Sequence, residues 1–217
     1  MPPITSAGVL QQPRVNPDFP DENFVNHFKV YKFAAQFAKG KRVLYVGSGT
    51  GYGSDYLANV ASTVTGIDNS RQAIRLARKR HSGPNYLLMD AHQLTFGDAS
   101  FDFILSSENF EHLPRQAIHL QELRRVLAPG GMALIATPNP EVSTGPNKFH
   151  FKENTYQELC ELLQPLFSEF VILENSLPHN LNRPHRVDPA ADPLLILGQR
   201  VDKTYLSNTH SFFRFCR

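Results

Sequence analysis

The sequence predicts an α/β fold, with a mostly parallel sheet flanked by helices, on three grounds. Short apolar strands alternate with helical stretches from Arg42 to Thr137, which favours parallel strands joined by right-handed crossovers. Alternate glycines at Gly47, Gly49 and Gly51 follow the first strand and allow the tight turn of a ligand-binding loop. The chain has 217 residues, of which 41% are hydrophobic, as expected for one domain with an ordinary core.

The elements can be placed in order along one domain, which we expect to span residues 21–217. Aromatic and apolar residues recur at helical spacing from Glu22 to Phe37, so we expect a helix there that Gly40 ends. Strands are expected near 42–46, 63–67, 85–89, 101–106 and 131–137. Helices are expected near 52–60, 70–81 and 114–127, and Pro114 suits the first turn of the last one.

The two ends of the chain are rich in proline. Residues 1–20 contain five prolines and little periodicity, so we expect an extended or disordered arm. A helix near 155–163 and a strand near 167–174 precede four further prolines at about 178–193, where we expect a long loop. A last apolar strand is expected near 194–200.

Charge and hydropathy exclude several partners. The net charge is only +2 with neutral histidines, so charge alone does not indicate nucleic acid. The basic stretch from Arg71 to Arg80 is more typical of a solvated helix face than of an RNA-binding one. We find no secretory signal and no apolar stretch near the ~20 residues of a membrane span. Two cysteines indicate a reducing compartment, so we expect a cytoplasmic protein. We expect it to be a monomer or a homodimer whose partner is a small molecule.

Three features at the ends of predicted strands indicate an adenosine-type cofactor. The glycine turn brings the backbone close to a ligand, and the N–H groups of the next helix face it. Asp68 ends the second strand, where a carboxylate can accept both ribose hydroxyls. Asp90 ends the third strand and can receive the adenine amino group. The glycine spacing, G-x-G-x-G-x-G, differs from the G-x-G-x-x-G of nicotinamide-binding domains.

With the later stretches Phe101-Asp102-Phe103 and Arg125-Val126-Leu127-Ala128-Pro129-Gly130-Gly131, the chain resembles the class I S-adenosylmethionine-dependent methyltransferases from about His27 to Leu163. It is similar in particular to small bacterial O-methyltransferases of the type 11 kind. The resemblance implies a Rossmann-like seven-stranded sheet in the order 3-2-1-4-5-7-6, with the last strand antiparallel. It also implies an enzyme that O-methylates a small hydroxylated acceptor, such as a sugar, a glycolipid precursor or a phenolic compound.

The same resemblance implies a set of cofactor-binding residues. These are His27, Tyr31, Tyr45, Gly47, Ser48, Gly49, Gly51, Asp68, Asn69, Asp90, Ala91 and Ser106. Two positions depart from the family pattern, because Tyr45 replaces a usual acidic residue and Val30 a usual arginine. These departures motivate an alternative, a non-catalytic protein with a methyltransferase fold that binds the cofactor or serves as a scaffold.

A second cluster indicates a divalent cation. Spacing i, i+3, i+4 would place Glu108, Glu111 and His112 on one face of a helical turn, where a cation would relieve their mutual repulsion. With His150, the stretch resembles two metal-dependent groups, the small-RNA 2′-O-methyltransferases and the ubiquinone-pathway O-methyltransferases. That resemblance implies four ligands, Glu108, Glu111, His112 and His150, for Mg²⁺, Mn²⁺, Fe²⁺ or Zn²⁺. Without a metal, His112 or His150 would be the catalytic general base.

Overall fold

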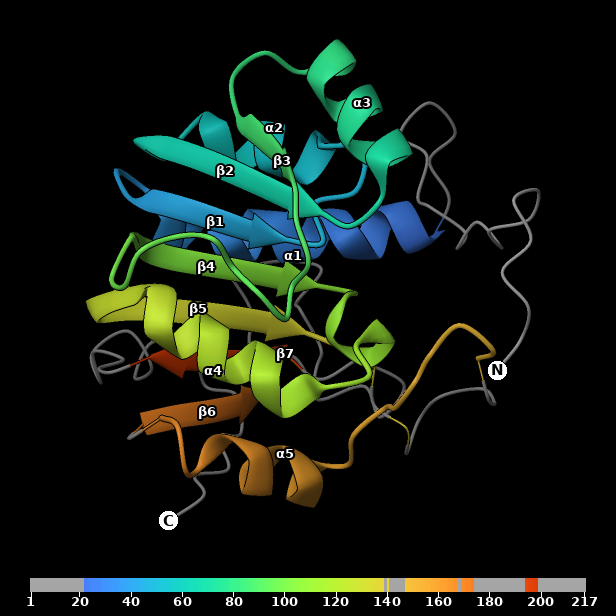
Figure 1. The fold of residues 1–217 in the computed structure, drawn as a ribbon, viewed down its shortest axis with the longest axis vertical. Coiled ribbons are helices and arrows are strands. Elements are labelled where there is room, and N and C mark those ends of the chain that lie inside the picture. Colours follow the sequence, from blue (N-terminus) through green and yellow to red (C-terminus); the bar gives the residue numbers. More distant parts are fainter. Residues whose placement is uncertain (1–21, 139, 141–146, 168, 174–193, 199–217) are drawn as a thin grey trace, which may run out of the picture.

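A computed structural model describes residues 22–138, 140, 147–167, 169–173 and 194–198 (Figure 1). The expected N-terminal arm and the proline-rich loop at about 178–193 lie outside the described residues. None of the described helices is long and apolar enough to cross a membrane.

The described strands form one seven-stranded sheet in the order β3-β2-β1-β4-β5-β7-β6. This is the order that the resemblance implied, and the predicted fold class is confirmed. The strands β1 to β5 run parallel, whereas β7 is antiparallel to both of its neighbours. The strands are β1 Arg42–Val46, β2 Thr63–Asp68, β3 Asn85–Leu88, β4 Phe101–Ser107, β5 Leu127–Ala136, β6 Glu169–Leu173 and β7 Leu194–Gly198.

Helices cover both faces of the sheet (Figure 1). One face packs under α1 (Glu22–Ala38) and α2 (Tyr52–Ala58), where apolar side chains of α1 meet β1, β4 and β5. The other face packs under α4 (Gln116–Val126) and α5 (Tyr156–Leu163) around a second apolar cluster. The helix α3 (Arg71–Arg80) packs against β2 and β3. The central strand β4 is buried along nearly its whole length, as expected for a parallel strand covered on both faces.

The boundaries differ most from prediction around β5. The strand begins at Leu127 rather than near residue 131, because Leu127 already pairs with Phe101 of β4. A shift of register follows between Phe101 and Phe103, and the left-handed Gly130 (φ 74°) lies in the irregular part. The predicted helix ends and the predicted strand begins on either side of Ala128-Pro129-Gly130. In the structure, β5 pairs with β4 both before and after these residues.

Candidate cofactor and metal site

The glycine turn after β1 adopts the backbone that only glycine accepts easily. Gly47, Gly49 and Gly51 have φ values of 75°, 55° and 95°. The N–H groups of Gly47 and Ser48 both donate to the carbonyl of Ile67 (2.9 Å each), which ties the turn to β2. A Cβ on Gly51 would lie 2.6 Å from the hydroxyl of Tyr86, so no larger residue fits. The turn therefore keeps its backbone bare at the carboxyl end of β1, as a closely approaching ligand requires.

Asp68 is held at the carboxyl end of β2 between the glycine turn and α3. Its Oδ2 accepts the N–H of Gly49 (2.9 Å), and its Oδ1 accepts the N–H of Ser70 (2.8 Å). These two bonds orient the carboxylate, and the neighbouring Asn69 is exposed beside it. The arrangement fits the expected role of Asp68 toward a ribose.

The loop after β3 carries Asp90 and Ala91, and it begins beside Asp68, because the N–H of Met89 donates to the carbonyl of Asp68 (3.1 Å). Oδ1 of Asp90 accepts hydrogen bonds from the N–H of His92 (2.8 Å) and from its ring Nδ1 (2.7 Å). The backbone bond of His92 is the main reason why the pKa of Asp90 lies below its usual value. Ala91 is buried, and its carbonyl accepts a bond from His119 on α4 (2.9 Å). Asp90 therefore presents an ionised, oriented carboxylate at the edge expected to hold adenine.

Asn109 is a site residue that the sequence reasoning missed. A Cβ on Gly47 would lie 2.8 Å from the side chain of Asn109, so the asparagine lies directly against the glycine turn. Its amide donates to Oγ of Ser106 (3.2 Å), a fully buried residue at the end of β4. The only signal in the sequence is its place between Ser106 and Glu111.

Tyr45, which stands where the family usually has an acidic residue, lies in a row of buried aromatic residues. Tyr45 is 2% exposed, and its hydroxyl donates to the hydroxyl of Tyr31 on α1 (3.0 Å), which lies 3.4 Å from Nδ1 of His27. Burial raises the pKa of both phenols, so both are neutral. A Cβ on Gly53 would lie 2.7 Å from Tyr45. Tyr45 is thus buried in the same apolar cluster as Val30, and its expected contact with the cofactor stays a prediction.

The backbone after β4 corrects the predicted metal cluster. Glu108 has a left-handed conformation (φ 49°), and only Phe110–His112 form a short 3-10 helix, η1. The prediction that Glu108 shares a helical face with Glu111 and His112 is therefore wrong. Three other side chains do converge, since ligand atoms of Glu111, His112 and His150 lie within 4.8 Å of one another. Glu108 is not a member of this group.

Each member of this group has a partner that orients it. Glu111 is fully buried, and its Oε2 accepts the hydroxyl of Thr137 (2.9 Å) while Oε1 lies 3.7 Å from Nε2 of His112. Nδ1 of His112 bonds to the carbonyl of Phe149 (2.9 Å), so Nδ1 carries a proton and Nε2 is the nitrogen that faces Glu111. Nδ1 of His150 lies 2.5 Å from a carboxylate oxygen of Glu153, its neighbour in the same segment. Partners of this kind are typical of metal-binding histidines.

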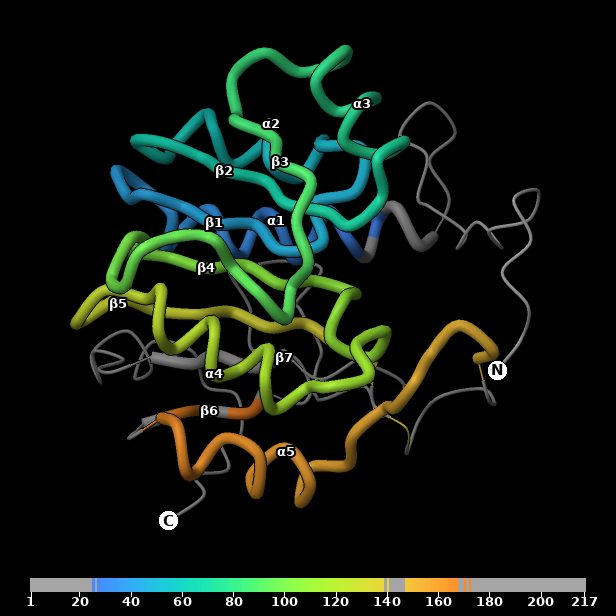
Figure 2. The backbone as a smooth tube through the Cα atoms, in the orientation of Figure 1, coloured from blue at the N-terminus to red at the C-terminus, as the bar shows by residue number. Residues whose placement is uncertain are grey.

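Two segments distant in sequence meet at this cluster, the loop after β4 and the segment before α5 (Figure 2). The carbonyl of Glu111 accepts the N–H of Phe151 (2.8 Å). Gln116, which is buried, donates to the carbonyl of Lys152 (3.0 Å) and accepts from the amide of Asn154 (2.8 Å). This buried amide pair brings His150 to Glu111, a contact that no local pattern in the sequence could predict.

We expect Gln116→Leu to lower the free energy of unfolding by about 2 kcal/mol, because buried partners of the amide would lose their hydrogen bonds. Urea denaturation of both proteins measures this difference. The matched control is Gln121→Leu on the exposed side of the same helix, which should change stability by less than about 0.5 kcal/mol. Equal stability of the two variants would contradict the role given to Gln116.

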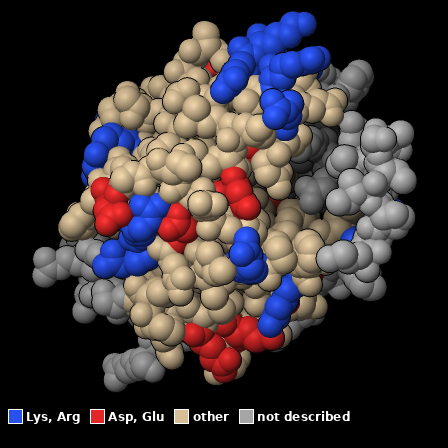
Figure 3. All heavy atoms as spheres, viewed as in Figure 1, with Lys and Arg blue, Asp and Glu red and all other residues tan. Residues whose placement is uncertain are grey.

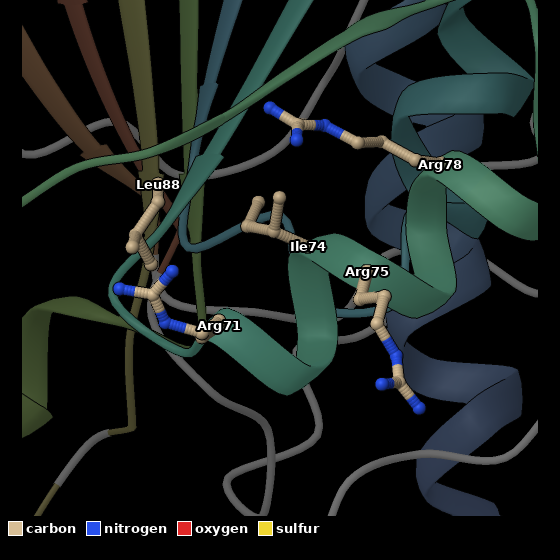
Figure 4. A pocket seen from close by; sticks show the side chains of 5 residues that line it. All are labelled: Arg71, Ile74, Arg75, Arg78 and Leu88. Atoms are coloured by element: carbon tan, nitrogen blue, oxygen red, sulfur yellow. The ribbon is translucent and has the colours of Figure 1, made fainter.

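A groove runs along one side of α3. It has a volume of about 290 Å³ and is lined by Arg71, Ile74, Arg75, Arg78 and Leu88. In Figure 4, Arg71 lies beside Leu88 while Arg75 points away from both. Basic side chains gather over α3 in Figure 3, and Arg78 donates to the carbonyl of Tyr86 through two nitrogens. None of the predicted site residues lines this groove.

Known proteins resemble the part of the chain that builds these loops. Residues 44–135 match the family model described as a methyltransferase domain. A probable S-adenosylmethionine-dependent methyltransferase of Mycolicibacterium smegmatis is 36% identical over 168 residues, which cover 74% of this chain and 65% of that protein. A fatty-acid O-methyltransferase of the same organism is 33% identical over 141 residues, which cover 61% and 52%. The chain thus spans between half and two thirds of the length of these relatives.

Solved structures agree on the fold. An S-adenosylmethionine-dependent methyltransferase from Mesorhizobium loti superposes with a TM-score of 0.62 at 18% identity, over 79% of this chain and 97% of that one. The residues of this chain that match the family model include the glycine turn, Asp68 and Asp90. These residues lie at the carboxyl ends of three adjacent strands. Residues 44–135 therefore form a methyltransferase domain, and the chain is similar in sequence and in fold to the class I S-adenosylmethionine-dependent methyltransferases.

Proposed function

We propose that the protein transfers the methyl group of S-adenosylmethionine to an oxygen atom of a small, lipid-like acceptor, with the help of a divalent cation. The observation that carries the proposal is the convergence of Glu111, His112 and His150 at the carboxyl end of β4. The cluster follows Asn109, which lies against the glycine turn, so an acceptor there would be next to the methyl donor.

The residues of the cluster fit a divalent cation. One buried carboxylate oxygen and two imidazole nitrogens form a ligand set that suits Mg²⁺, Mn²⁺, Fe²⁺ or Zn²⁺. The bond from Nδ1 of His112 to a carbonyl makes Nε2 the nitrogen that would bind a cation, and at His150 the cation would replace the amide of Asn147 that donates to Nε2 (3.0 Å). A cation bound there would lower the pKa of the acceptor hydroxyl. Glu111, His112 and His150 would be its ligands.

The chain itself contributes positioning and proton transfer. Methyl transfer gains much of its rate from holding donor and acceptor in line, which the rigid ends of β1 and β4 provide. In the absence of a cation, Nε2 of His112 would be the general base. The ring of Phe151, which directly follows His150, is 71% exposed and offers an apolar contact. This contact and the similarity to a fatty-acid O-methyltransferase support a lipid-like acceptor.

Incubation with radiolabelled S-adenosylmethionine tests the proposal on a panel that contains a fatty acid, a hydroxylated lipid, a phenol and a sugar. We expect label in a lipid-like acceptor, loss of labelling after chelation, and recovery with one of the four cations. Turnover that persists in excess chelator would contradict the metal site but not the methyltransferase activity. Binding of S-adenosylhomocysteine with no labelling of any acceptor class would favour the alternative of a non-catalytic scaffold.

A further inference from the structure

A row of polar side chains on α4 holds the backbone of the loop that follows β3. His119, Glu122 and Arg125 are spaced three residues apart, so neighbouring members share one side of the helix. Nδ1 of His119 bonds to the carbonyl of Ala91 (2.9 Å). Glu122 accepts the N–H of Leu94 (2.7 Å), and Arg125 donates to the carbonyl of Leu94 (2.7 Å). Figure 2 shows this loop running from β3 toward α4 before it turns back to β4.

His119 is the most deeply buried polar member of this row. Its side chain is fully buried, and its only hydrogen bond within the described part of the chain is the one to Ala91. A carbonyl can only accept, so Nδ1 of His119 carries the proton and the ring is neutral. Burial of the other ring nitrogen, Nε2, without a hydrogen-bond partner costs free energy, which the fold tolerates at this position.

The peptide that His119 holds also holds Asp90. The carbonyl of Ala91 and the N–H of His92 belong to one planar peptide group, so they cannot rotate independently. The carbonyl end is bonded to His119 and the N–H end donates to Oδ1 of Asp90 (2.8 Å). The orientation of the Asp90 carboxylate is thereby linked to a side chain of α4 that lies beneath the loop.

We propose that His119 is a positioning residue for adenine recognition, because it fixes the peptide of Ala91 and His92 and so aims the carboxylate of Asp90 at the adenine amino group. The inference rests on the proposed function in one respect, the contact of Asp90 with that amino group. It assigns the preference for adenine to a fully buried residue on α4 that is hydrogen-bonded to the carbonyl of Ala91.

The test compares two ligands by calorimetry, S-adenosylhomocysteine and S-inosylhomocysteine, which has a carbonyl oxygen where adenine has its amino group. A carboxylate that accepts from the amino group favours the first ligand. We expect His119→Leu to weaken S-adenosylhomocysteine binding about tenfold and to lower the preference over the inosine analogue at least about fivefold. His119→Asn keeps an amide N–H at the position of Nδ1 and should restore most of that preference.

A buried control separates positioning from general loss of stability. Leu163→Ala on α5 removes a fully buried side chain, so it should lower stability without changing the ratio of the two affinities. An unchanged ratio in His119→Leu would overturn the inference while leaving the proposed function intact. A wild-type protein that binds both ligands equally would overturn the role of Asp90 and the inference with it. A wild-type protein that binds neither would contradict the proposed function itself.

Discussion

Glu111→Gln is expected to reduce methyl transfer by at least about a hundredfold, while the affinity for S-adenosylhomocysteine changes less than about twofold. The glutamine keeps the shape of the buried side chain and can still accept from Thr137, but it removes the negative charge from the cluster. The loss should therefore appear in turnover and in cation affinity, and not in cofactor binding. Labelling rates and calorimetry on the same preparation measure both quantities.

His150→Ala should likewise reduce methyl transfer and cation affinity without changing the affinity for S-adenosylhomocysteine, because it removes a ligand of the same cation. This ligand comes from a different segment of the chain. The matched control is Glu161→Gln, which neutralises an exposed carboxylate on α5 and should leave turnover unchanged. Full activity of Glu111→Gln at saturating acceptor would contradict the metal site. A parallel loss of activity and of cofactor affinity would instead indicate that Glu111 belongs to the cofactor pocket.

The cofactor half of the site could be predicted because its signals are local. The positive φ values of Gly47, Gly49 and Gly51 follow from a spacing that is visible in the sequence. Asp68 and Asp90 each end a strand, and parallel topology places the carboxyl ends of strands at one edge of the sheet. Knowledge of the strand order was then enough to bring these residues together.

The metal half could be predicted only in part because its geometry is not local. The left-handed Glu108 interrupts the expected helical face, and no pattern of residue types distinguishes that turn from a helix start. His150 reaches Glu111 through the buried amides of Gln116 and Asn154, which are polar residues at positions that sequence reasoning treats as surface. Contacts between distant segments of this kind require the structure.

The contact of His119 with Ala91 could not be predicted from the sequence for a related reason. It directly precedes Leu120 on a helix whose buried face also contains Leu123 and Val126, so its place on the apolar side was visible. Its partner is a backbone carbonyl, and backbone groups leave no trace in the sequence. Burial of the ring was therefore predictable in principle, whereas its bond to Ala91 was not.

Acid should destabilise this protein through His119 at pH values where most surface carboxylates are still ionised. Burial lowers the pKa of His119 from 6.5 to about 4, because the protonated ring would be desolvated. The charged groups that face the ring are Asp90 and His92 from the loop and Glu122 from α4, and burial outweighs their combined effect. The folded protein therefore keeps this histidine neutral while the unfolded chain takes up a proton.

The direction and the size of the change in the free energy of unfolding follow from the difference in proton binding between the folded and unfolded states. Between about pH 6.5 and pH 4 the unfolded state binds more protons, so the free energy of unfolding falls as the pH falls, by roughly 3 kcal/mol for this one group. Urea denaturation from pH 7 to pH 4.5 measures the slope. His119→Asn removes the titrating ring and should flatten that slope, whereas His81→Asn, at the C-terminal end of α3 and 3.1 Å from Asp55, should not. Parallel slopes for the wild type and His119→Asn would show that other groups, such as Asp90 and Glu122, determine the acid sensitivity.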